Sequence, residues 1–379
     1  MPKEDEVKKN LYKYIVLGII YIAFSFISSS HICLAAAEIS SSPSEKQEKM
    51  VRARIISIDL QKHQNSAQSV ELITLEGAHK QQRFVTSFYA TGIFYGITLR
   101  ENDEVFVTLF LNGDGAVEKV SITEIARDKY MTYLLLGFIG LLVLIGGSKG
   151  IRAILSLLAT YFAIIYVLFP LILQGYDPTY ITIGLCSVIA IFTLLLVGGH
   201  NKKTFAALIG TLCGLCAAAY LTITIGDLAH FTGAIDEDSY LLEYLPQDSI
   251  FSYQGLFFAG IIIGSLGAVM DVSMSIASAV NELKEKTYSL SSFQLIKAGM
   301  NVGKDTIGTM ANTLILAYTG GSIYMLLLLS AENISLHQLI NREIIASEIL
   351  RSMAGSIGLT ITVPITAIVA GLLFQRQHP

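Results

Sequence analysis

Seven small or polar residues lie on one face of a single membrane-length segment, 260–282. They are Gly260, Gly264, Gly267, Asp271, Ser275, Ser278 and Glu282, separated by 4, 3, 4, 4, 3 and 4 residues. Those steps place all seven on one side of a helix with 3.6 residues per turn. The residues between them are almost all apolar, and a carboxylate in such a segment costs roughly 2.5–3.5 kcal/mol and is expected to face protein or water. Asp271 is therefore the first candidate for a carrier of a proton or cation.

Two further polar stripes follow. One is Asn301, Asp305, Gly308 and Asn312, spaced 4, 3 and 4; the other runs through Glu348, Ser352, Gly355, Thr362 and Thr366, around Pro364. At about 1.5 Å of rise per residue, we expect Asp271, Asn312 and Thr366 at similar depths if their helices pack side by side. The candidate proton- or ion-coupling residues are Asp271, Ser275, Ser278, Asp305, Asn312 and Thr366, with Asn312 and Ser275 nearest to Asp271.

Glycines in these stripes are expected to let a neighbouring helix approach closely. The candidates for helix packing are Gly260, Gly264, Gly267, Gly308 and Gly355. A purely structural interpretation stays open for the serines and threonines too, because their hydrogen bonds between membrane helices are worth only about 0.6 kcal/mol on average.

The residue types give little support for a metal site, a cofactor site, a nucleotide site or a protease. Cys213 and Cys216 have CxxC spacing but lie in an apolar run without a charged neighbour, and the seven histidines are scattered, so we expect no metal site and no cofactor. Gly303-Lys304 is followed by Asp305 where a nucleotide-binding P-loop needs Ser or Thr. An intramembrane protease would need a second carboxylate at depth, for which Asp305 is the only candidate. We therefore predict no catalytic residues and no enzyme.

The composition indicates a membrane protein. The 379 residues are 53% hydrophobic and 15% charged, against about 25% charged in soluble proteins, and the mean hydropathy is +0.58. A net charge of −4 argues against nucleic-acid binding. The lipid bilayer is therefore the first expected partner.

Three regions follow from the patterning. Residues 1–37 predict a signal peptide or anchor helix, with lysines before an apolar run and Ala35-Ala36-Ala37 as a cleavage site. Residues 38–128 predict a small extracytoplasmic β-barrel or OB-like domain, with alternating strands at 51–60, 69–76, 83–87, 104–111 and 117–122 and a turn at 112–115. Residues 129–379 predict seven transmembrane helices, at 131–147, 151–174, 179–198, 204–226, 254–279, 307–330 and 349–374. The fold class is a polytopic α-helical membrane protein with about seven to eight transmembrane helices.

The distribution of basic residues predicts the orientation. One set of connections carries Lys149, Arg152, Lys202, Lys203, Lys284, Lys286, Lys297, Lys304 and Arg376. The other set is nearly free of them, and its longest loop, 227–252, is acidic. By the positive-inside rule, residues 38–128 lie outside and the C-terminus is cytoplasmic.

The chain resembles the YibE/F family of bacterial multi-pass membrane proteins. The motifs are Gly267-Ala-Val-Met-Asp271-Val-Ser-Met-Ser-Ile-Ala-Ser278, then Asn301-Val-Gly-Lys-Asp305 with Gly308-Thr-Met-Ala-Asn312, then Ala354-Gly-Ser-Ile-Gly-Leu-Thr-Ile-Thr-Val-Pro364. The resemblance implies a location in the bacterial plasma membrane and brings no assigned reaction. The stretch 267–286 is also similar to the Asp-bearing helix of RND permeases and SecD/SecF proteins, in which an intramembrane carboxylate takes part in proton coupling.

From these observations we expect an ion-coupled transporter or export helper that uses Asp271. The alternative is a non-transporting scaffold or regulatory subunit whose β domain binds a protein partner. A homo-oligomer is compatible with either function.

Overall fold

The computed structural model describes residues 47–59, 68–89, 97–113, 116–235, 239, 242, 252–287, 290–331 and 334–374. The predicted signal or anchor, 1–37, lies outside these residues, as does part of the predicted turn at 112–115. The chain divides into two compact units, Met1–Leu141 and Leu142–Pro379, and each is described by itself.

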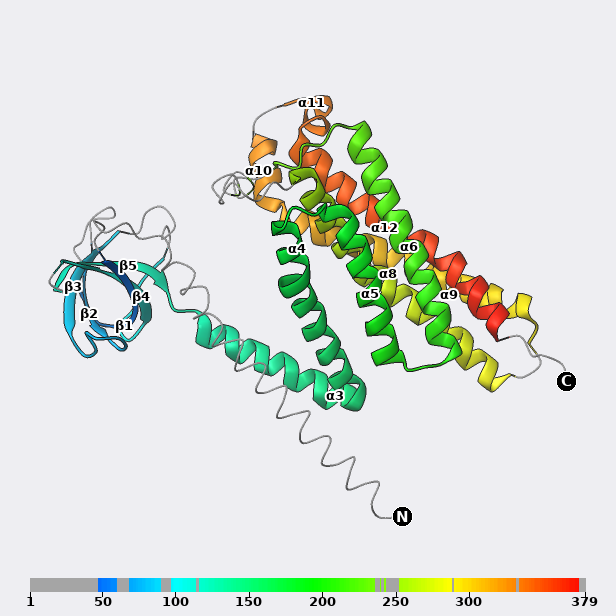
Figure 1. Ribbon diagram of the computed structural model, residues 1–379, viewed down its shortest axis with the longest axis horizontal. Coiled ribbons are helices and arrows are strands. Elements are labelled where there is room, and N and C mark those ends of the chain that lie inside the picture. The colour runs from blue at the N-terminus through cyan, green and yellow to red at the C-terminus, as the bar shows by residue number, and fades with distance from the viewer. Residues whose placement is uncertain are drawn as a thin grey trace, which may run out of the picture. The chain divides into compact units, whose positions relative to one another are not determined.

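The first unit contains one five-stranded antiparallel sheet (Figure 1). The strands are β1 (Gln47–Asp59), β2 (Gln68–Thr74), β3 (Arg83–Phe88), β4 (Glu104–Leu111) and β5 (Val117–Ile125), in the order β3-β2-β1-β4-β5. The sheet curls until its edge strands β3 and β5 meet. There Thr86 Oγ1 on β3 donates a 2.7 Å hydrogen bond to the Val120 carbonyl on β5. The prediction of a small β domain is confirmed as a curled antiparallel sheet.

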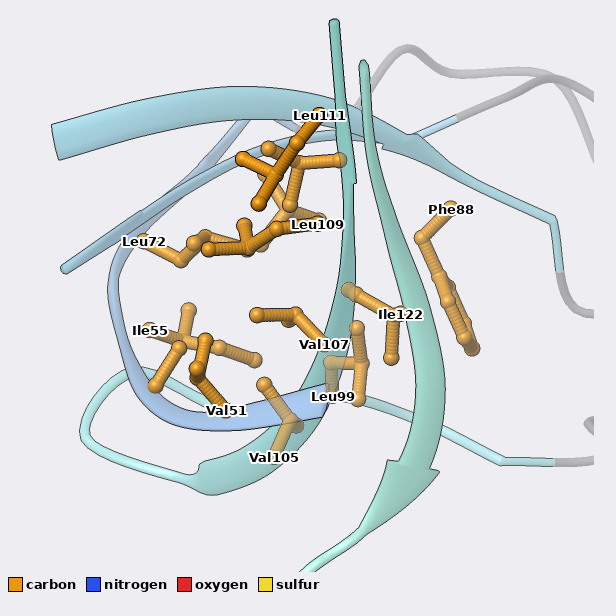
Figure 2. Packing of buried hydrophobic residues seen from close by; sticks show 13 residues of the cluster. Val51, Ile55, Leu72, Phe88, Leu99, Val105, Val107, Leu109, Leu111 and Ile122 are labelled. Carbon is orange, nitrogen blue, oxygen red and sulfur yellow. The ribbon is translucent and has the colours of Figure 1, made fainter. Parts of the chain in front are cut away.

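Alternation of buried and half-buried residues explains the sheet. Along β4, Val105, Val107, Leu109 and Leu111 are buried while the residues between them are half-buried, which is the period of two expected when one face covers a core. The buried side chains converge inside the curl (Figure 2). A bulge between Ile55 and Ser57 interrupts the pairing of β1 with β2, and bulges bend a strand.

Charged side chains tie the sheet to the start of helix α3 (Asp128–Ala163). Glu104 accepts hydrogen bonds from Lys129 Nζ at 2.6 Å, Arg52 Nη1 at 3.0 Å and Arg54 Nη2 at 3.0 Å, and Arg52 also pairs with Asp128. The bond from Lys129, followed by those from Arg54 and Arg52, lowers the pKa of the Glu104 carboxyl from 4.5 to about 2. The ionised carboxylate therefore stabilises the junction between β4 and α3.

The second unit is a helical bundle (Figure 1). Its elements are the remainder of α3, the π-helix η4 (Ile164–Leu168), α4 (Phe169–Leu173), α5 (Pro178–Gly198), α6 (Lys202–Leu228), α8 (Tyr253–Lys286), α9 (Ser292–Gly321), α10 (Ile323–Ala331), α11 (Leu336–Ile340) and α12 (Glu343–Leu373). Helix α12 packs against α6, α8 and α9, and α8 also packs against α5 and α6. The main core lies where α6, α8, α9 and α12 meet, around Val272, Ile276, Leu359 and Val363.

Five of the described helical stretches are long and apolar enough to cross a membrane, and the bent pair α9 and α10 would make a sixth span. The first stretch, Asp128–Leu173, has 46 residues and would be roughly 69 Å long as one straight helix, about twice the hydrocarbon thickness. It breaks at Gly147, where φ is 52° and ψ is −129°, a conformation that favours glycine.

The predicted span 307–330 falls within a longer, bent pair of helices. Helix α9 begins fifteen residues earlier, at Ser292, behind a capping box in which Ser291 and Gln294 exchange hydrogen bonds. It ends at Gly321, and α10 continues at an angle of 66°. Polar residues lower the hydropathy of the first turns of α9, although they are compatible with helix when they occupy one face.

We expect Glu104→Gln to lower the local free energy of unfolding of β1 and β4 by about 1 kcal/mol at pH 7, because the ion pairs it removes are partly exposed. The folded pKa lies below the unfolded one, so this contribution is complete above about pH 4.5 and is lost as the pH falls through about 2. Hydrogen exchange of the two strands measures it. Glu71→Gln, which breaks an exposed pair with Arg83, is the control, and equal losses from both variants would contradict the prediction.

Candidate functional site

A cavity of about 440 Å³ opens beside Asp271 in the second unit. Its walls come from α3, η4, α5 and α8, and the polar side chains in them are Ser156, Thr160, Thr182, Thr193 and Asp271. The remaining walls are mainly aliphatic, with Met270, Met274 and Cys186 among them. Among the described lining residues, Asp271 is the only one that carries a charge.

The Asp271 side chain projects from the exposed face of α8. Val269 and Val272, on either side of it in sequence, are buried in the bundle core, which turns Asp271 away from that core and leaves it exposed. Its carboxylate makes no hydrogen bond or ion pair with any described residue. The carboxylate is therefore available to a proton, a cation or water.

Hydroxyl groups from α3 and α5 line the cavity around this carboxylate. Ser156 Oγ donates a 2.7 Å hydrogen bond to Thr193 Oγ1 and joins the two helices. Thr182 is fully buried, and its Oγ1 has no hydrogen-bond partner in the described part of the chain. A buried hydroxyl left unpaired costs about 1–3 kcal/mol, and Thr182 Oγ1 is closed off from the cavity in the described structure.

A π-helix forms one wall. Residues Ile164 and Leu168 line the cavity from η4, and Pro170 follows in α4. Proline has no N–H to donate to the preceding turn, and π-helical turns commonly occur at functional sites.

Sequence reasoning missed the four hydroxyl residues of the cavity. Ser156 and Thr160 are four residues apart, and Thr182 and Thr193 are eleven apart, so each pair shares a helix face. The spacing that identified the stripe on α8 would have found them. Chain patterning could not show that these two faces line one cavity with Asp271.

The other predicted coupling residues on α8 and α9 lie at a suitable depth but outside the cavity. A Cβ on Gly303 of α9 would lie 3.2 Å from Ile276 of α8, and one on Gly264 of α8 would lie 2.7 Å from the Tyr318 hydroxyl of α9. Asp271 is thus level with the middle of α9. However, Ser275, Asp305 and Asn312 are exposed and Ser278 is half-buried, and none of them lines the cavity.

Thr366 belongs to a different interface, between α12 and α6. It is fully buried, and a Cβ on Gly210 would overlap its Oγ1. One turn earlier, a Cβ on Gly214 would overlap Thr362 Oγ1, which donates a 3.0 Å hydrogen bond to the Gly358 carbonyl. The structure thus assigns these threonines to close helix packing and does not bring Thr366 to Asp271.

The predicted packing glycines have mixed surroundings. A Cβ on Gly264 would meet Tyr318 and one on Gly355 would meet Ser265, whereas Gly260, Gly267 and Gly308 have no described atom within 4 Å of a Cβ. The closest approaches involve glycines on other helix faces, such as Gly210 and Gly214. The open glycines of α8 and α9 leave those faces uncovered in the described structure.

A charged pair links three helices further along the bundle. Arg351 Nη1 lies 3.2 Å from Glu348 Oε1 on α12. The same guanidinium lies 5.7 Å from the ring centre of Phe257 on α8 and 5.9 Å from that of Tyr318 on α9. Cation–π contacts of this kind stabilise a charge that is partly removed from water.

Comparison with known proteins identifies the family. The family described as YibE/F-like protein matches residues 134–376, which is more than half of the chain, so the chain belongs to this family. No curated protein and no solved structure matches it. The similarity of 267–286 to RND permeases and SecD/SecF proteins stays a prediction.

We expect Gly210→Ala to lower the stability of the bundle by about 1–3 kcal/mol, because the added methyl overlaps Thr366 and forces repacking. Gly260→Ala, on an open face, should be neutral or slightly stabilising, since alanine favours helix by up to about 1 kcal/mol. Thermal unfolding in detergent measures both. Equal effects would contradict the packing assigned to α6 and α12.

We also expect the cavity to be reached by water. In a chain whose native cysteines are replaced by serine, Thr160→Cys should react with a water-soluble maleimide at least tenfold faster than Cys213 kept alone. Cys213 is the matched control because it is exposed on α6 within an apolar segment. Equal rates would indicate that lipid or protein fills the space beside Asp271.

Proposed function

We propose that this YibE/F-like protein is an ion-coupled membrane transporter, or an export helper driven by ion flow, in which Asp271 carries the proton or cation. The observation that supports this most is the position of its carboxylate, at the edge of a 440 Å³ cavity whose mainly aliphatic walls also carry a few hydroxyl residues. The proposal gives the chain no catalytic role.

The cavity has room for water, and the polar side chains among its mainly apolar walls offer water partners. Liquid water occupies about 30 Å³ per molecule, and a cavity retains water when polar partners are present. The cavity therefore has room for on the order of ten waters, with Asp271 and Thr160 as partners. Water there would let the carboxylate exchange a proton or bind a cation without contact with hydrocarbon.

The oxygen atoms of the cavity lining are better suited to bind a hard cation or a proton than an anion. Carboxylate and hydroxyl oxygens are the donors that hard cations prefer. The lining offers no described basic side chain for an anion. The transported substrate itself is not specified by these groups.

The proposed topology has seven spans after the sheet domain. The break at Gly147 divides Asp128–Leu173 into two, α5, α6, α8 and α12 supply four, and α9 with α10 supplies one. With lysines concentrated on one side, the sheet domain lies outside and the C-terminus in the cytoplasm of a bacterial plasma membrane. Asp271 then lies near the middle of α8, at a depth suited to alternate contact with both sides.

The test is ion uptake by the full chain in proteoliposomes with an imposed membrane potential, followed with pH-sensitive and Na⁺-sensitive dyes. Asp271→Asn should reduce the uptake of the wild type at least tenfold, and Asp271→Glu should retain part of it. The control is Glu282→Gln, which removes a carboxylate from the same face of α8, where it pairs with Lys286 at the helix end.

Two results would contradict the proposal. One is full uptake by Asp271→Asn. The other is absence of proton and Na⁺ uptake by the wild type together with lower thermal stability of Asp271→Asn, which would favour the scaffold alternative.

A further inference from the structure

Helix α9 presents its polar face away from the bundle. Its buried residues are Leu295, Gly299 and Gly303, which face α8 and α12. Gly308 and Asn312 each follow one of these glycines by nine residues, and nine steps of 100° place them on the opposite side of the helix. Asn301, Asp305, Gly308 and Asn312 are accordingly all exposed.

This face lies at membrane depth. Gly303 packs against Ile276 of α8 and Val363 of α12, and Tyr318 approaches Gly264 of α8. The part of α9 between them is therefore level with 264–276, the middle of a helix that is long and apolar enough to span. Against hydrocarbon, the Asp305 carboxylate alone would cost roughly 2.5–3.5 kcal/mol.

The polar face has the periodicity of a helix pair. Asn301, Gly308 and Ile315 recur every seven residues, as do Asp305, Asn312 and Thr319. The small and polar residues Asn301, Asp305, Gly308 and Asn312 are spaced 4, 3 and 4, which is the spacing of the residues along the seam of two parallel helices. Gly308 in the middle allows close approach, and asparagine hydrogen-bonds across helices in membranes.

The charges along the seam indicate which molecule covers the polar face of α9. Lys304 flanks the seam, next to Asp305, and both side chains are exposed without an ion pair to any described residue. When two parallel copies of α9 face each other across a two-fold axis, opposite flanks of the two helices meet. Lys304 of one copy then lies beside Asp305 of the other, twice.

We propose that a second copy of this chain covers the polar face of α9 and forms a two-fold dimer in the membrane. Every inserted copy presents the same helix at the same depth and in the same direction, so the seam meets itself in register. The proposed dimer does not depend on ion transport, and it is tested by measurements other than ion uptake.

Oxidative cross-linking in native membranes tests the dimer. In the full chain with its native cysteines replaced by serine, Asn312→Cys should form a disulfide-linked dimer. Cys213 kept alone, exposed on α6, is the control and should cross-link at least tenfold less. A yield at Asn312→Cys no higher than at Cys213 would overturn the proposal, as would rapid reaction of Asn312→Cys with a water-soluble maleimide, which would show a water-lined face.

A charge exchange tests the pairing. Lys304→Asp and Asp305→Lys should each lower the dimer fraction, measured by native mass spectrometry in mild detergent, by at least about threefold, which corresponds to about 0.6 kcal/mol. The double variant carries the two charges in exchanged positions and should restore the dimer. Expression and monomer elution equal to the wild type exclude misfolding, and a monomeric double variant would refute the pairing.

Discussion

Hydrocarbon offers no partner to a carboxylate, an amide or a hydroxyl, and this constraint governs the helical unit. Most polar side chains on its helices are satisfied within the protein. Thr211 and Ser273 share a 2.6 Å hydrogen bond between α6 and α8, Ser156 bonds Thr193, and Arg351 pairs with Glu348. Asp271 beside its cavity and the outward face of α9 lack such partners in the described structure, as do the buried hydroxyl oxygens of Ser356 and Thr366.

Close helix contact explains why the unpaired polar side chains of Asp271 and of the outward face of α9 lie outside the centre of the bundle. At Gly210 and Gly214 on α6, Thr366 and Thr362 of α12 fit where a Cβ would stand, so α6, α8 and α12 form a tight centre. Helix α9 joins that centre through Gly299 and Gly303, leaving its other side free. The segment from α3 to α4 meets α5 and α8 around a cavity, with the bond from Ser156 to Thr193 as one direct link.

Much of the fold could be predicted because it depends on local periodicity. The alternation in 104–111 corresponds to β4, and the apolar runs 179–198 and 204–226 correspond to α5 and α6. The hydropathy did not indicate where α9 starts, because Lys297, Lys304 and Asp305 lower it without breaking the helix. Of the candidate site, Asp271 was predicted from the cost of a carboxylate in an apolar segment. Ser156, Thr160, Thr182 and Thr193 were not predicted, because they come from helices distant from Asp271 in the chain.

Sequence alone determined that this is a helical membrane protein with a small β domain, and which residues share a face of each helix, because the 3.6-residue and two-residue periods are properties of the backbone. Tertiary structure decided which neighbour each face meets. Asp271 and Asn312 lie at similar depths, and each belongs to a stripe of polar residues spaced three and four apart. Even so, Asp271 lines the cavity shared with α3 and α5, whereas Asn312 lies on the exposed face of α9. That choice depends on how glycines and threonines of α6, α8, α9 and α12 fit together, and contacts between distant segments leave no period in the chain.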